Sequence, residues 1–148
     1  MTNRAWKPIA VAGLVLAAAC RSSSVEPADS LAAARARWAR NAPVSYSYTI
    51  QRSCECLAEA AGPVTVVVRN GVVESRTYVA TGASVAAQYA SIFPAVEGLF
   101  AMIDNAIKNG TTPLTTRYDP TLGYPIRIAL GDPAVDAPLY LVSNLTPR

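Results

Sequence analysis

Residues 44–51 read Val44-Ser-Tyr-Ser-Tyr-Thr-Ile-Gln51, an unbroken alternation of apolar and polar side chains. Because successive side chains of a β-strand point to opposite faces, this pattern predicts a strand with one buried face. Tyrosine, valine and isoleucine are also residue types that strands favour. The stretch therefore predicts a half-buried strand, and the neighbouring segments are interpreted around it.

Two more strands are predicted in this half of the chain. Residues 64–68 form a short valine-rich run, and Asn70-Gly71 separates it from the next run at residues 72–79. An Asn-Gly pair between two apolar runs is a strong signal for a two-residue hairpin turn. Three antiparallel strands are therefore predicted here.

Segments with helical spacing flank these strands. Residues 31–40 form the first predicted helix, with Asp29-Ser30 as its N-cap and Trp38 facing the sheet. Residues 94–110 form the second, because apolar residues repeat there at helical spacing and a glycine closes the segment. Residues 82–91 have a weaker pattern that is compatible with a short helix.

Three further strands are predicted at residues 114–118, 126–130 and 139–145, with a turn at residues 119–123. The element order is then helix, three strands, helix, three strands. Antiparallel strands with segregated helices indicate an α+β fold, in which the helices cover one face of a sheet of about six strands.

The first twenty residues have the pattern of an export signal. Arg4 and Lys7 precede an apolar run that is too short to span a bilayer, and small residues lead up to Cys20. Residues 16–20, Leu-Ala-Ala-Ala-Cys, resemble the lipobox of bacterial lipoproteins, which implies that the Cys20 thiol is acylated and becomes the new N-terminus. The alternative is an ordinary signal peptide or an N-terminal membrane helix in which Cys20 is a small apolar residue.

This interpretation divides the chain into a signal peptide at residues 1–19, a flexible tether at 20–28 and a single α+β domain at 29–148. We expect the protein to be lipid-anchored in the cell envelope, on the extracytoplasmic side of the inner or outer membrane. Removing Arg4 and Lys7 with the signal lowers the formal net charge from +3 to about +1. A nucleic-acid partner therefore has no electrostatic basis.

Catalytic motifs are missing from the sequence. The chain contains no histidine, which excludes Ser-His-Asp and Cys-His catalysis, His-ligated zinc and the commonest general base. Glycine-rich phosphate loops, a nucleophile elbow and the acidic spacing of an EF-hand are missing as well. We therefore expect neither an enzyme nor a bound cofactor or metal.

Two cysteines, Cys54 and Cys56, remain once Cys20 carries lipid. An even number of cysteines in an exported chain favours a disulfide, although an extended strand must bend for residues i and i+2 to bridge. A strained bridge is more easily reduced, which opens the alternative of a thiol–disulfide redox protein. Free thiols, a metal contact and pairing with another chain stay open.

Several motifs are similar to those of a bacterial exported domain family of unknown function. The most specific are Cys54-x-Cys56 after a tyrosine-rich strand and the turn Tyr118-Asp119-Pro-x-x-Gly-Tyr124-Pro, and the likeness spans residues 38–146. The resemblance implies an envelope domain, often lipid-anchored. It implies no activity and no functional residues.

Tyr118, Asp119 and Tyr124 flank this turn, where a carboxylate beside two phenols can bind a polar ligand. The alternative is structural, because an aspartate before proline commonly caps a turn and strand tyrosines pack across strands. The sequence as a whole predicts a non-enzymatic, lipid-anchored binding module with a protein or glycan partner in the envelope. Redox chemistry at Cys54 and Cys56 is the alternative function.

Overall fold

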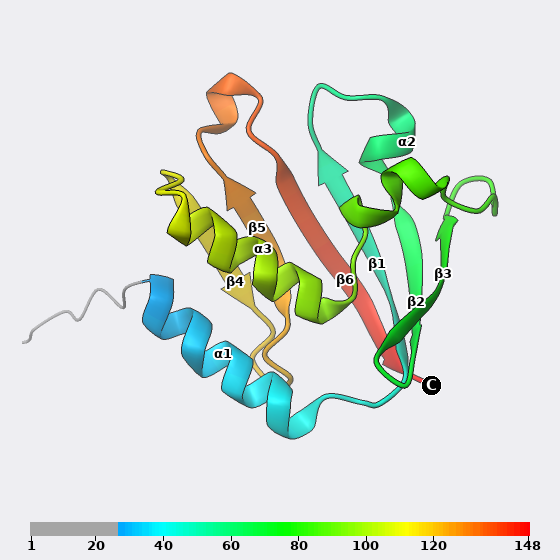
Figure 1. Ribbon diagram of the computed structural model, residues 1–148, viewed down its shortest axis with the longest axis horizontal. Coiled ribbons are helices and arrows are strands. Elements are labelled where there is room, and N and C mark those ends of the chain that lie inside the picture. The colour runs from blue at the N-terminus through cyan, green and yellow to red at the C-terminus, as the bar shows by residue number, and fades with distance from the viewer. Residues whose placement is uncertain (1–26) are drawn as a thin grey trace, which may run out of the picture.

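The computed structural model describes residues 27–148, which form a six-stranded sheet with helices on one of its faces (Figure 1). The α+β fold that the sequence predicts is confirmed. The predicted signal peptide, most of the predicted tether and the predicted acylation site Cys20 lie outside the described residues.

Two long helices, α1 (Pro27–Asn41) and α3 (Val96–Lys108), correspond to the two predicted helices. α1 begins earlier than predicted, because proline fits the first turn of a helix, where its missing N–H is not needed. Asp29-Ser30, the predicted N-cap, therefore lies inside the helix. Three short elements complete the helical part: α2 (Ala58–Ala61) and the 3-10 helices η1 (Ala87–Ile92) and η2 (Pro133–Val135).

The sheet has the strand order β3-β2-β1-β6-β5-β4, and every neighbouring pair is antiparallel. Each half of the chain forms a three-stranded meander, and the two meanders join where β1 pairs with β6. The strands are β1 (Tyr46–Ser53), β2 (Val64–Arg69), β3 (Val72–Tyr78), β4 (Leu114–Tyr118), β5 (Pro125–Leu130) and β6 (Leu139–Pro147).

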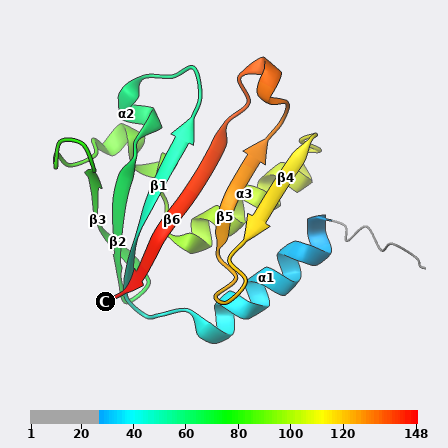
Figure 2. The same ribbon diagram turned by 180° about the vertical axis from the view of Figure 1, so that it is seen from behind.

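The hydrophobic core lies between the sheet and the helices. The alternation predicted for the first strand is confirmed, because Tyr46, Tyr48 and Ile50 are buried while the polar residues between them point to the other face. Helices α1 and α3 cover the buried face, and Figure 2 shows that no described helix crosses the opposite face. The largest other contributors to the core are Leu31 and Trp38 of α1, Val96, Leu99, Phe100 and Ile103 of α3, Val64, Val66 and Val68 of β2, Ile128 of β5 and Val142 of β6.

Candidate functional site

A groove of about 560 Å³ runs between helices α1 and α3, and we call it the α1–α3 groove. This volume falls in the range of about 300–1,000 Å³ that is common for small-ligand sites. Alanines and the rings of Trp38 and Phe100 make most of its walls. Its charged groups are the carboxylates of Glu97 and Asp104 and the guanidinium of Arg35. A mostly apolar groove with a few converging charges has the makeup of a binding site.

The Glu97 carboxylate is held in place by two donors from other elements. Trp38 Nε1 donates to Glu97 Oε1 at 2.9 Å, and the Tyr46 hydroxyl donates to Glu97 Oε2 at 3.3 Å. The same hydroxyl accepts a hydrogen bond from the backbone N–H of Val96 at 3.1 Å. Glu97 forms no ion pair with any residue that the structure describes. It is therefore a positioned anion with capacity for a cationic ligand.

The tyrosines below the groove are buried donors. Burial raises the pKa of the Tyr46 phenol, and the nearby negative charge of Glu97 adds to this effect. Burial likewise raises the pKa of the Tyr48 phenol, which donates to the carbonyl of Pro94 at the start of α3. Both hydroxyls therefore stay protonated at neutral pH, and the Tyr46 hydroxyl can donate its hydrogen bond to Glu97.

Arg35 and Asp104 bridge one end of the groove. Arg35 Nη2 donates to Asp104 Oδ2 at 2.7 Å, and the guanidinium carbon lies 5.2 Å from the centroid of the Phe100 ring. Both charged side chains are close to half exposed, so the pair contributes at most about 1 kcal/mol. Because Asp104 is already paired, Glu97 is the carboxylate that a cation would approach.

The predicted tyrosine-flanked turn packs against α1. Asp119 Oδ1 accepts hydrogen bonds from the backbone N–H groups two and three residues further on, at 2.9 and 2.6 Å. Tyr124 packs edge-on against Trp38 with ring centroids 6.2 Å apart, and Tyr118 stacks on Phe100 at 6.4 Å. These contacts account structurally for Tyr118, Asp119 and Tyr124, and ligand binding at this turn stays a prediction.

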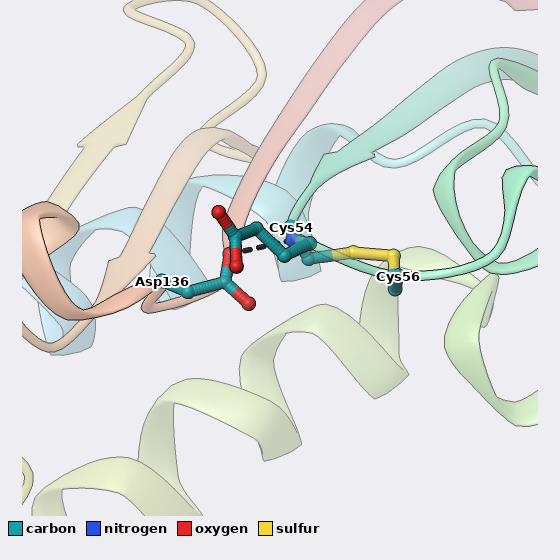
Figure 3. Close-up of a disulfide and its surroundings, with 4 residues drawn as sticks. Cys54, Cys56 and Asp136 are labelled. Atoms are coloured by element: carbon teal, nitrogen blue, oxygen red, sulfur yellow. Dashed lines mark hydrogen bonds between the residues drawn. A yellow bond between two sulfur atoms is a disulfide. The ribbon is translucent and has the colours of Figure 1, made fainter.

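Cys54 and Cys56 form a disulfide just beyond the end of β1, with their Cα atoms 5.2 Å apart (Figure 3). The backbone N–H of Glu55, between the two cysteines, donates to Asp136 Oδ1 at 2.6 Å. This hydrogen bond connects the disulfide loop with the β5–β6 connection. Cys54 is half-buried and Cys56 is exposed.

The charges beside the disulfide do not favour thiolate chemistry. Reactive cysteines sit in electropositive surroundings that stabilise the thiolate. Here Glu55 and Asp136 place carboxylates next to the disulfide loop, and nearby negative charge disfavours a second anion. The disulfide is therefore better explained as a structural bridge within the loop after β1, and redox exchange stays a hypothesis.

Sequence reasoning did not single out Glu97. Its partner Trp38 lies 59 positions away in the chain, so no local spacing connects them. An acidic residue in the first turn of a helix is also explained by the helix dipole alone. Only the packing of α1 beside α3 shows that the two side chains meet.

No group of three or more His, Cys, Asp or Glu side chains in residues 27–148 is arranged to hold a metal ion. None of the helices described there is long and apolar enough to cross a membrane.

The family of unknown function DUF6174 matches residues 30–147, which is almost all of the described domain. The matched range includes the disulfide, the tyrosine-flanked turn and both helices of the groove. No curated protein and no solved structure matches the chain.

Proposed function

The chain belongs to the DUF6174 family, whose function is unknown, and we propose that it is a lipid-anchored, non-enzymatic binding protein of the cell envelope. The anchor is inferred from the lipobox-like residues before Cys20. The binding role is inferred from the α1–α3 groove. Each part has its own experimental test.

The observation that supports binding most strongly is the Glu97 carboxylate, which two donors orient and which no cation neutralises among the described residues. A lysine or arginine of a partner protein would gain a charge-assisted hydrogen bond there. Its aliphatic stem would lie along the apolar walls of the groove. The partner is therefore an envelope protein that presents a basic side chain, rather than a neutral glycan.

The makeup of the groove supports binding over catalysis. The side chains that line it include no serine, threonine or cysteine, and the Tyr46 hydroxyl beside Glu97 is a phenol whose pKa is raised by burial, which disfavours the nucleophilic phenolate. The carboxylate itself is engaged by Trp38 and Tyr46, which suits a fixed recognition element better than a mobile proton carrier.

Photocrosslinking in intact cell envelopes tests the binding role. A benzoylphenylalanine placed at Ala101, which lines the groove and is exposed, should yield a reproducible protein adduct. Glu97→Gln should reduce adduct formation about tenfold, because it removes one charge-assisted hydrogen bond. Glu59→Gln, which changes an exposed carboxylate on α2, is the matched control and should change nothing. The absence of any adduct, or equal losses in both variants, would contradict the proposal.

Metabolic labelling with radioactive palmitate tests the anchor. The wild-type protein should be labelled and should fractionate with membranes, whereas Cys20→Ser should do neither. An unlabelled wild-type protein would rule out the lipid anchor and would leave the binding role proposed for the α1–α3 groove unaffected.

A further inference from the structure

The face of the sheet opposite the helices, which we call the open face, is uncovered in the described part of the chain (Figure 2). Its side chains are those that alternate with the buried positions of the strands. Hydroxyl groups are prominent among them, from Thr49, Thr65, Ser75, Thr77 and Ser143. Polar side chains therefore predominate on the open face, where Leu141 of β6 is an exposed apolar residue in register with Arg127.

Two arginines stand directly opposite each other on this face. Arg117 of β4 pairs in register with Arg127 of β5, next to Ile128, which points into the core. Like charges at directly opposed positions of antiparallel strands are destabilising, because their Cβ atoms are only about 4.5–5.5 Å apart. Neither arginine forms an ion pair with a residue that the structure describes. The pair is therefore a concentration of positive charge that the domain itself does not neutralise.

Acidic residues are nearly missing from the sheet. Glu74 is the one acidic residue within the six strands, and Arg69 binds it at 2.6 Å. The remaining described carboxylates belong to helices, turns and loops, such as Glu97 on α3 and Asp136 beside the disulfide. The open face thus carries a net positive charge at its β4–β5 side.

The described chain begins at this same side of the sheet. β4 is an edge strand, and α1 packs beside it, so the described chain begins on the same side of the sheet as β4 and β5 (Figures 1 and 2). The seven peptide steps from Cys20 to Pro27 span at most about 25 Å. An acyl chain on Cys20 would keep the basic edge of the domain close to a bilayer.

We propose that the open face docks on an anionic membrane surface through Arg117 and Arg127. This inference rests on the lipid anchor proposed above. Each arginine near an anionic lipid surface favours the docked state about fivefold, so the pair favours it about 25-fold at low salt. In the docked domain the α1–α3 groove points away from the bilayer and faces its partner.

Fluorescence quenching by headgroup-labelled lipid tests this orientation. The acylated protein, purified from membranes, is reconstituted into phosphatidylcholine vesicles with or without one quarter phosphatidylglycerol. A thiol-reactive fluorophore is attached at Thr115→Cys on the open face or at Ala101→Cys on the helical face. Cys54 and Cys56 do not compete for it, because they are joined in a disulfide. Quenching is expected at Thr115→Cys in the anionic vesicles alone and not at Ala101→Cys.

Two double variants separate local charge from total charge. Arg117→Gln with Arg127→Gln should lower the ratio of docked to undocked domain about 25-fold. Arg40→Gln with Lys108→Gln removes the same charge from the helices and should leave the ratio unchanged. The first double variant relieves a like-charge pair, so its melting temperature should not fall, and lost quenching would not reflect unfolding.

Several results would overturn the docking proposal. Equal quenching in neutral and anionic vesicles would show that charge does not hold the open face against the membrane surface. Equal effects of the two double variants would show that Arg117 and Arg127 play no special part, and quenching at Ala101→Cys would reverse the orientation. Failure of the anchor is seen separately, because a protein without acyl chains does not float with the vesicles.

Discussion

Gly123 is the position at which one added methyl group would most directly disturb the packing of the β4–β5 turn on α1. Its φ is +86°, and a Cβ there would lie 2.3 Å from the backbone oxygen of Ala34 and 2.8 Å from the Cβ of Arg37. The first neighbour belongs to the helix backbone, so it cannot rotate aside as a side chain would. Gly123→Ala must therefore push the turn away from α1 or shift the helix.

The expected cost has two parts. A non-glycine residue in the left-handed region costs about 1–2 kcal/mol. Overpacking against a fixed neighbour adds about 1–3 kcal/mol. We expect Gly123→Ala to lower the free energy of unfolding by about 2–5 kcal/mol. This is a large share of the total free energy of unfolding of a typical domain, which is about 5–15 kcal/mol.

Gly110→Ala is the matched control, because Gly110 also has a positive φ, +68°, but an added Cβ would meet no atom within 4 Å. It should lose only the conformational part, about 1–2 kcal/mol. Urea unfolding followed by the fluorescence of Trp38 measures both variants. If Gly123→Ala is no less stable than Gly110→Ala, the close approach of the turn to α1 is refuted.

Three other outcomes follow from contacts described above. Trp38→Phe keeps an aromatic ring but removes the N–H that donates to Glu97. We therefore expect urea unfolding, followed by circular dichroism, to show a loss of about 1–2 kcal/mol in the free energy of unfolding. A double-mutant cycle with Glu97→Gln should show coupling, and purely additive losses would argue against the hydrogen bond. Cys54→Ser should lower the free energy of unfolding by only about 1–2 kcal/mol, because the bridge to Cys56 closes a very short loop. An insulin-reduction assay should show no cysteine-dependent turnover, and measurable turnover would favour the redox alternative. Burial raises the folded-state pKa of the Tyr48 phenol above its ordinary value of 10.0. The contribution of Tyr48 to stability is therefore complete below about pH 10 and is lost as the pH rises further. The free energy of unfolding measured from about pH 8 to 11 should fall less steeply in Tyr48→Phe, and an identical slope in both proteins would count against this assignment.

Much of the secondary structure could be predicted because its signals are local. The alternation in β1, the Asn70-Gly71 hairpin turn between β2 and β3 and the apolar repeat of α3 each lie within about a dozen residues. The errors were local as well. The first helix was predicted to start after Asp29-Ser30, whereas α1 starts at Pro27, and the four-residue helix α2 was missed because it is too short to show a periodic pattern.

The sequence predicted the Cys54–Cys56 pair but not the α1–α3 groove. Cys54 and Cys56 are two residues apart, so the sequence itself brings them within reach of each other. The Glu97 cluster instead unites residues from α1, β1 and α3, and its members are separated by dozens of positions. Their side chains meet because both helices pack on the same face of the sheet, which no spacing rule contains.

The sequence by itself determined the strands, the two long helices and the antiparallel α+β class, since side-chain periodicity and turn residues act over short distances. Only the tertiary structure decided that β1 pairs with β6, that Arg117 of β4 stands opposite Arg127 of β5, and that Glu97 accepts hydrogen bonds from Trp38 and Tyr46. Such non-local contacts form only when the entropy cost of closing a long loop is offset by burial of a shared core. Which residues meet therefore depends on the whole domain and not on any single segment.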